Sequence, residues 1–408
     1  MTSTPFALRR KFIINLGKAL HKFGTPAYRL EAHLLNVAEI LGLGGSFIVT
    51  PTALTFVLWQ KGEHESQQTY AYRVKPGDLD LGSLARTDEL VEELASGQRS
   101  LAEAIDRLED IENKPNPYSH FVTFLAFGTS GGAFAMLMAT SWNDVLWSML
   151  LSLIIYTFVF WAEKSRGVAK MLEPLVSLIS GFLVTAIMHI DPHINMPLVV
   201  LSSIIAFIPG LALTLGLREL AARDLMSGTA RIMDAIMLLF KLYFGAVLGM
   251  AIGQLTWGSV EFVQPETVAP WTAWLAVLLL GSSLVVMFKI RLKDSPWGIM
   301  SGFIAFGMSL VAAEYFGIAL GAFFGAFCVG LFSNLYARVF NAPAILVSLQ
   351  GLVILVPGSK VYIGLNTVVS GESIIAVEHI GTQSFLIFMS LVAGLIFSSV
   401  VLPPKRSL

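Results

Sequence analysis

The spacing of hydrophobic residues changes once along the chain, near residue 118. Before this point apolar residues alternate with charged ones, whereas after it they form long runs with few charges. A run of about 20 apolar residues is long enough to cross a bilayer as an α-helix. Ten such runs follow, at 121–140, 145–162, 174–190, 197–217, 235–257, 271–288, 297–313, 318–337, 343–366 and 382–402. The pattern therefore predicts an α-helical polytopic membrane protein with an N-terminal domain and linker at 1–118.

Within the N-terminal domain, the spacing of the apolar positions predicts a small α/β fold. Helical spacing and strand-like runs of β-branched and aromatic residues follow one another. Ser100 and Glu103 form a capping-box pattern before the last helix. The expected elements are two helices within 8–41, divided at Gly24-Thr25-Pro26, then a β-hairpin from 47–59 and 69–74, then helices at 87–96 and 101–112, and a linker at 113–117.

One motif occurs twice in the membrane part, a Pro-Gly pair followed by five residues and Gly-Leu. It begins at Pro209 in the fourth apolar run and at Pro357 in the ninth. Proline removes a backbone donor and glycine loosens the next turn, so each helix is expected to break there. In lipid, a break survives only where protein or a water-filled cavity satisfies the freed groups. Two matching breaks in two halves point to a transporter's substrate site, and two packing kinks are the alternative.

The place of the motif in runs four and nine predicts two repeats of five helices, at 119–257 and 258–408. An odd repeat unit inverts the second half relative to the first, a common plan of secondary transporters. Both prolines then lie near the middle of the bilayer. The candidate substrate site consists of the breaks and the small or polar residues after them: Pro209, Gly210, Thr214, Gly216, Pro357, Gly358, Ser359, Lys360 and Gly364.

Composition agrees with a membrane protein, and the charges give it an orientation. Of 408 residues, 55% are hydrophobic and 13% are charged. Basic residues lie at alternate ends of the predicted helices: Lys164, Arg166, Lys170, Arg218, Arg223, Arg231, Lys289, Arg291, Lys293, Arg338, Lys405 and Arg406. The other loops carry Asp144, Asp191, Glu261, Glu266, Glu372 and Glu378. The positive-inside rule then places both termini in the cytoplasm and the protein in the cytoplasmic membrane.

Four charged residues are candidates for a role within the membrane. Lys360 follows Pro357 by three residues and, at the start of a new helix, would suit a carboxylate; snorkelling to the interface is the alternative. Asp234 and Lys241 lie on roughly the same face of the fifth helix and are candidates for an ion pair in proton coupling. Glu314 is a candidate protonatable carboxylate. A snorkelling lysine and an interfacial glutamate are the alternatives for Lys241 and Glu314.

The remaining motifs indicate packing rather than chemistry. Glycine recurs at every fourth position in two helices, which is typical of close packing inside a bundle or between protomers, so a homo-oligomer stays open. These rows are Gly245, Gly249 and Gly253, and Gly317, Gly321 and Gly325. The sequence His189-Ile190-Asp191-Pro192-His193 is interpreted as a solvated turn rather than a metal site. Without a nucleotide-binding or hydrolase motif, we expect no enzyme activity, cofactor, metal or nucleic-acid partner.

Together these features resemble the threonine/serine exporter family over nearly the whole chain. In the N-terminal part the resemblance rests on Gly17-Lys18-Ala19-Leu20, Gly24-Thr25-Pro26-Ala27-Tyr28-Arg29-Leu30-Glu31, Leu41-Gly42 and Thr50-Pro51. In the membrane part it rests on Ile208-Pro209-Gly210 with Ser227-Gly228 and on Val356-Pro357-Gly358 with Ser370-Gly371. The order and spacing of these short motifs carry the resemblance.

The resemblance implies export of small hydroxy amino acids, threonine or serine, driven by the proton gradient across the cytoplasmic membrane. Split members, with one chain similar to residues 1–257 and another to the remainder, are associated with dicarboxylate export. A dicarboxylate exporter, which would need a second cation beside Lys360, is therefore an alternative. A membrane sensor or scaffold acting through the N-terminal domain is another, and would have unbroken helices at both Pro-Gly positions. The expected partners are a small-molecule substrate, protons and lipid.

Overall fold

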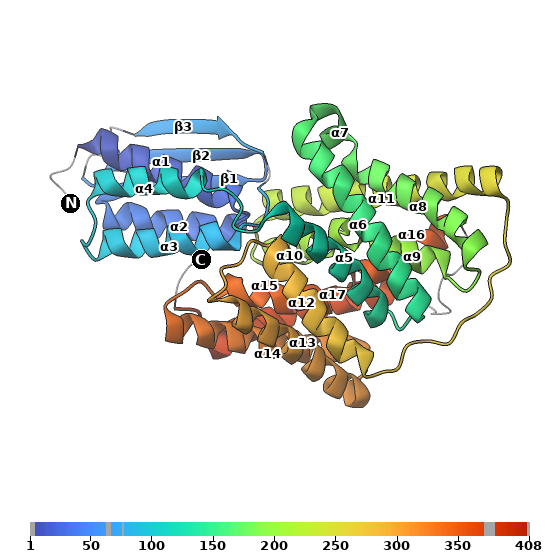
Figure 1. Cartoon of the computed structure of the whole chain (residues 1–408). Coiled ribbons are helices and arrows are strands. Elements are labelled where there is room, and N and C mark those ends of the chain that lie inside the picture. Colours follow the sequence, from blue (N-terminus) through green and yellow to red (C-terminus); the bar gives the residue numbers. More distant parts are fainter. Residues whose placement is uncertain (1–4, 63–66, 76, 371–379, 406–408) are drawn as a thin grey trace.

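Residues 5–62, 67–75, 77–370 and 380–405 are described by the computed structural model of the chain. Figure 1 shows the N-terminal domain, in blue and cyan, at one end of a bundle of apolar helices. We call that end of the bundle the domain-side end and the opposite end the far end. The predicted loop charges Glu372, Glu378 and Arg406, and Gly371 of the second Ser-Gly motif, lie outside the described residues.

The N-terminal domain packs four helices against a three-stranded antiparallel sheet in the order β1-β2-β3 (Figure 1). Its elements are α1 (Phe6–Lys22), α2 (Ala27–Ile40), β1 (Leu43–Thr50), β2 (Ala53–Gln60), β3 (Gln68–Arg73), α3 (Leu81–Ala95) and α4 (Leu101–Glu112). In β2, every second residue points into the core, so that Leu54, Phe56 and Leu58 are buried. The small α/β domain is thus present as a helical layer on one sheet.

The predicted β-hairpin is wrong in one respect, because residues 47–59 do not form a single strand. They belong to β1 and β2, and β3 pairs with β2 as the third strand. The chain reverses at Pro51, which has no N–H to donate to a sheet ladder. The turn is closed by Thr50, whose Oγ1 lies 3.0 Å from both the N–H and the carbonyl oxygen of Ala53. The proline was therefore the signal that this run contains two strands.

The third helix begins earlier than the predicted residue 87. The Asp80 carboxylate accepts the backbone N–H of Ser83 at 2.8 Å and caps α3, which starts at Leu81. The fourth helix has the predicted bounds, and its capping box is confirmed by reciprocal bonds between Ser100 and Glu103.

Each apolar run of the membrane part forms a helix or a broken pair of helices. These are α5 (His120–Leu137), α6 (Trp142–Lys164), α8 (Leu172–Ile190), α9 (Met196–Ser203) with α10 (Gly210–Ala221), α11 (Leu225–Trp257), α12 (Thr272–Met287), α13 (Ser295–Phe316), α14 (Ile318–Phe340), α15 (Ile345–Leu355) with α16 (Gly358–Ser370), and α17 (Ile380–Val401). A short helix, α7 (Arg166–Lys170), links α6 to α8. Among the described residues, eight spans are long and apolar enough to cross a membrane, and the pair α9 and α10, bent by 57°, makes a ninth.

The sixth predicted segment, α12, has only 16 residues and is shorter than a typical span. Its two ends nevertheless lie at opposite ends of the bundle. Just before it, the Val268 N–H donates to the carbonyl oxygen of Thr140 at 2.8 Å, at the far end of α5. Just after it, the carbonyl oxygen of Phe288 accepts the N–H of Leu81 in the N-terminal domain at 3.0 Å. The helix therefore runs from the far end to the domain-side end.

The glycine rows pack helices closely within the chain. The three α11 glycines are Gly245, Gly249 and Gly253. A Cβ atom at any of them would collide with α8, for example with the Leu178 carbonyl oxygen at Gly249 and the Thr185 hydroxyl at Gly253. In α14, a Cβ at Gly321 would lie 2.6 Å from the Ser309 carbonyl oxygen of α13. Gly317 differs, because it has a positive φ of 84° between α13 and α14. The close packing predicted from spacing is thus confirmed inside the bundle.

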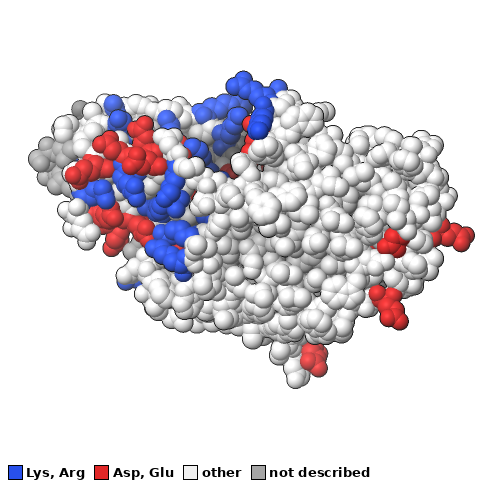
Figure 2. Space-filling view, viewed as in Figure 1, with Lys and Arg blue, Asp and Glu red and all other residues white. Residues whose placement is uncertain are grey.

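Charges are distributed very unevenly over the surface. Figure 2 shows Lys and Arg gathered over the N-terminal domain and the adjoining end of the bundle, whereas the visible charges at the far end are Asp and Glu. The surface between these two ends is almost free of charge on this face. This belt is the part of the molecule suited to lipid.

Candidate functional site

Both Pro-Gly motifs break a helix, as the sequence predicts. The α10 helix begins at Gly210 and α16 at Gly358, each directly after its proline. The residues before the prolines have nearly identical backbones, with φ −67° and ψ 119° at Ile208 and φ −67° and ψ 127° at Val356. This extended conformation is the one that a following proline favours. Before the first break, the 3₁₀ helix η2 (Ile205–Phe207) adds a further tight turn.

The two breaks lie against each other. A Cβ atom added to Gly210 would lie 3.1 Å from the Cα of Gly358, and one added to Gly358 would lie 3.1 Å from the Cα of Gly210. The neighbouring contacts are also reciprocal, because Gly210 faces Val356 and Gly358 faces Ile208. Segments 148 residues apart in the sequence therefore touch through their backbones at equivalent positions. A Cβ at either position would be closer to the other segment than side chains ordinarily pack, so the two segments would have to move apart.

The other predicted site residues do not all face this crossing. Thr214 is fully buried, and its hydroxyl donates to the carbonyl oxygen of Gly210 at 3.1 Å, so it bonds within its own helix. Gly216 packs against α11, where a Cβ would lie 2.8 Å from Ile232. Ser359 and Lys360 are half-buried in the first turn of α16, where N–H groups have no partner within the helix. Gly364, little more than one turn further on, is also half-buried.

Two buried polar residues near the breaks were not predicted. Ser202 and Gln350 each lie seven residues before a motif proline, and both are 0% exposed. The Ser202 hydroxyl and both polar atoms of the Gln350 amide have no hydrogen-bond partner. The Gln350 amide lies against Gly298 of α13. The register that relates Pro209 to Pro357 also relates these two positions, so the repeat could have identified them from the sequence.

The predicted coupling residues are not brought together. Asp234 and Lys241 are both exposed on α11, and the ion pairs formed by the described residues do not include them. Helix α11 begins at Leu225, ten residues before the predicted start, so Lys241 lies near its middle. Seven residues are almost two turns, and two side chains that far apart do not meet unless both bend toward each other. Glu314 is exposed near the end of α13 beside Tyr315, in agreement with an interfacial position.

The N-terminal domain is attached to the half-helix that follows the first break. Glu219, near the end of α10, is 0% exposed and accepts two bonds from the Arg231 guanidinium, at 2.9 and 3.0 Å. It also accepts the N–H of Ala27, the first residue of α2, at 3.2 Å. Nearby, the Ser227 hydroxyl donates to the carbonyl oxygen of Val49 at 3.0 Å. We call this group of contacts the first attachment, and it belongs to the first membrane half.

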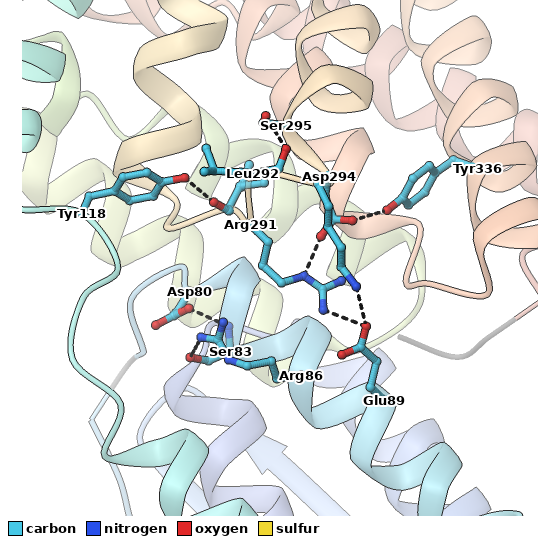
Figure 3. Close-up of polar contacts among 12 residues, drawn as sticks. Asp80, Ser83, Arg86, Glu89, Tyr118, Arg291, Leu292, Asp294, Ser295 and Tyr336 are labelled. Atoms are coloured by element: carbon cyan, nitrogen blue, oxygen red, sulfur yellow. Dashed lines mark hydrogen bonds and ion pairs between the residues drawn. The ribbon is translucent and has the colours of Figure 1, made fainter.

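The second attachment joins α3 to the connection 288–294 between α12 and α13 (Figure 3). Figure 3 shows the Arg291 guanidinium between two carboxylates, Asp294 at 2.6 Å and Glu89 at 2.8 Å. Lys293 also bonds Glu89, at 3.0 Å, and the Tyr336 hydroxyl donates to Asp294 at 2.8 Å. Burial opposes ionisation of Glu89, but the bonds from Lys293 and Arg291 outweigh it and hold the pKa of this carboxyl below its usual value. The N-terminal domain thus contacts both predicted membrane halves, residues 119–257 and 258–408.

A multi-pass helical membrane protein with two discontinuous helices in contact has the construction typical of membrane transporters. Comparison with known families agrees with this class. The chain belongs to the threonine/serine exporter family: one family model, a threonine/serine exporter, matches residues 11–253, and a second, Threonine/Serine exporter, ThrE, matches 273–401. The residues between the two matches, 254–272, include the whole connection between α11 and α12. Neither model describes an enzyme family.

Curated relatives are distant and longer. "Pheromone-regulated membrane protein 10" of Debaryomyces hansenii is 24% identical over 360 residues, covering 86% of this chain and 36% of the relative. The protein of the same name from Yarrowia lipolytica is 24% identical over 369 residues, covering 86% and 30%. An uncharacterized protein of Schizosaccharomyces pombe is 23% identical over 360 residues, covering 86% and 47%. The chain therefore spans about a third to a half of these relatives, and no solved structure matches it.

Proposed function

We propose that the protein is a secondary active exporter of threonine, serine or similar small hydroxy amino acids, driven by the proton gradient across the cytoplasmic membrane. The observation that carries the proposal is the backbone contact between the breaks at Gly210 and Gly358. Broken helices free backbone groups that lipid cannot satisfy, and a solute can bind those groups. A zwitterion would set its carboxylate against the first turn of α16 and Lys360, and its ammonium group against carbonyl oxygens freed before the break.

Two further features support this site. Ser202 and Gln350 leave buried polar atoms unpaired before both breaks, and such groups within a membrane domain are costly unless they have a function. Packing is also parallel in the two proposed halves. Helix α5 packs on α6 as α12 does on α13, and α8 packs along α11 as α14 does along α17. This parallel supports ten crossings in a five-plus-five inverted repeat, with α12 as the sixth.

The alternatives make different demands on the same region. A dicarboxylate exporter would need a second cation near Lys360 for the second carboxylate. A scaffold acting through the N-terminal domain would have no need of two broken helices in contact. The breaks therefore favour transport over a scaffold, and the substrate is decided by experiment. Proteoliposomes loaded with labelled threonine, succinate or lysine, with and without a proton gradient, would release threonine fastest under the gradient if the proposal is correct.

Replacing Lys360 should impair export severely. In Lys360→Ala we expect at least a tenfold slower efflux per inserted protein, because a charge-assisted bond to the solute is worth about 1.5–3 kcal/mol. Lys360→Arg should keep part of the rate. The matched control is Lys170→Ala, which removes an exposed lysine from the short helix α7 and should export normally. Wild-type efflux from Lys360→Ala would leave Lys360 as a snorkelling residue and move the site elsewhere.

The proposed orientation has both termini in the cytoplasm and can be tested by cysteine labelling. Cys328 is partly exposed and is first replaced by serine. An impermeant thiol reagent added outside should then label His193→Cys and Gln264→Cys, and leave Arg166→Cys and Lys293→Cys unmodified until the membrane is opened. Lys293 is a better inside position than Arg291, because its side chain is 63% exposed against 13%. Labelling of position 293 from outside would contradict the five-plus-five plan.

A further inference from the structure

The stretch that most resembles the family, residues 24–31, lies directly against the end of the half-helix α10. Tyr28, in the first turn of α2, lies beside Arg218 of α10. The guanidinium carbon of Arg218 is 5.6 Å from the centre of the Tyr28 ring. Arg29 is the next residue on α2. Arg218 follows Gly210 by eight residues, so this group lies about 12 Å from the first break along the same helix.

Two guanidinium groups, those of Arg29 and Arg218, lie near Tyr28 without an ion-pair partner. Among the described residues, the ion pairs include neither Arg29 nor Arg218. The acids nearest to them in the sequence already have other partners: Glu219 accepts from Arg231 and from the N–H of Ala27, and Glu31 accepts the N–H of Val49 at 2.7 Å. A cation removed from water without a counterion is strongly unfavourable, so such groups normally have an anionic partner.

Several hydrogen-bond donors at this place also lack an acceptor. The Tyr28 hydroxyl, the Arg29 Nη1 and the Thr25 hydroxyl are buried and make no hydrogen bond of normal geometry, although the Tyr28 hydroxyl and the Arg29 side chain lie close to each other. Other incompletely bonded arginines differ, because Arg9 and Arg86 each donate through another guanidinium nitrogen within the domain. Unpaired groups here are therefore O–H and N–H donors, which call for a ligand rich in acceptors.

The electrostatics at Tyr28 agree with a positive site. Burial opposes the phenolate, but the charges of Arg29 and Arg218 outweigh it, so the pKa of the Tyr28 hydroxyl lies below its usual value. Arg218 remains partly exposed, so that a solute can reach it. Planar guanidinium groups bind carboxylates in a bidentate manner, with greater specificity than a lysine would.

We propose that Tyr28, Arg29 and Arg218 form a binding site for a small carboxylate at the junction of the N-terminal domain and α10. Its occupant is the carboxylate group of the solute before it reaches the breaks, a statement that rests on the proposed export function. The site itself rests only on the unpaired donors and charges. Because the ligand would bridge α2 and α10, its binding would also strengthen the first attachment.

The test is equilibrium binding to the full-length protein in nanodiscs, followed by calorimetry and thermal unfolding. The probes are L-threonine, succinate, inorganic phosphate and L-threoninol, which lacks the carboxylate. We expect threonine or succinate to bind and to raise the melting temperature, and threoninol and phosphate not to do so. Equal binding of threoninol, binding of phosphate alone, or no binding of any probe would each overturn the site.

Variants separate ligand binding from a structural role. Arg218→Gln and Arg29→Gln should bind at least tenfold more weakly, whereas the ligand-free melting temperature stays equal or rises because an uncompensated charge is removed. The matched control Arg223→Gln removes an exposed arginine just beyond α10 and should bind normally. A lower ligand-free melting temperature with unchanged affinity in Arg218→Gln would assign a structural role and refute the site.

Transport is measured on the same protein and variants reconstituted in proteoliposomes, so that the two proposals can fail separately. Efflux of threonine without carboxylate binding at Arg218 would support the export function and refute this binding site. Carboxylate binding that depends on Arg218, without efflux of any probe from proteoliposomes, would support this binding site and refute the export function.

Discussion

Gly210→Ala and Gly358→Ala will each disable transport while the protein still inserts in the membrane. A Cβ at position 210 would lie 2.5 Å from Val356 Cγ1 and 3.1 Å from the Gly358 backbone, and a Cβ at position 358 would lie 3.0 Å from Ile208. Either methyl group forces the two breaks apart. Overpacking of this kind costs about 1–3 kcal/mol, and it falls on the region where we place the substrate.

The measurement is efflux per inserted protein, together with the melting temperature in detergent. Gly281→Ala is the control, because its Cβ would meet Ile299 at an ordinary 3.5 Å. Both single variants separate the same two backbones, so the double variant should lose less than the sum of the single losses. Wild-type efflux and stability in Gly210→Ala would mean that the contact between the breaks has no part in transport.

Glu219→Ala will partly release the N-terminal domain from the first membrane half, because only the bond between Ser227 and Val49 remains of the first attachment. The change leaves the Arg231 guanidinium and the Ala27 N–H without their acceptor. Breaking a buried ion pair in this way costs about 3–5 kcal/mol. The loss of unfolding free energy should lie toward the lower end of this range, because the Arg231 side chain is 27% exposed and water can solvate its charge.

Limited proteolysis of the linker at 113–117 and thermal unfolding measure this release. Cleavage should become faster and the melting temperature should fall. Glu219→Gln keeps an acceptor for Ala27 and should have a smaller effect. The control Glu39→Ala breaks a pair with Lys61 whose side chains are 77% and 58% exposed, and should cost at most about 1 kcal/mol. Unchanged proteolysis in Glu219→Ala would contradict a stabilising role for the first attachment.

Local signals in the sequence were sufficient for much of the fold. The Pro-Gly pairs gave both breaks because proline acts on its own helix, and the bounds of α4 followed from a capping box. Errors arose where a local signal was passed over. Pro51 divided one predicted strand into two, and Asp80 started α3 six residues early.

The candidate site was less predictable, because its contacts join distant segments. Spacing placed Asp234 and Lys241 on one face of α11. Both are exposed because the face that packs against α8 is the one that carries the glycines. Nothing near residue 27 indicates that its N–H is capped by residue 219. The contact of Gly210 with Gly358 could be inferred only from the symmetry of the repeat, and the buried pair Ser202 and Gln350 follows from that same symmetry.

The N-terminal domain is joined to both proposed membrane halves, which also touch each other at the breaks, so that these contacts form a closed loop. The first half is joined through Glu219 and the second through the connection 288–294, and the two breaks touch inside the bundle. In such a loop, one half cannot tilt against the other unless a joint stretches, slides or opens. If export proceeds by such tilting, the N-terminal domain opposes the conformational change, and the weaker of the two attachments sets the size of this barrier. Each transport cycle would then include one opening of that attachment.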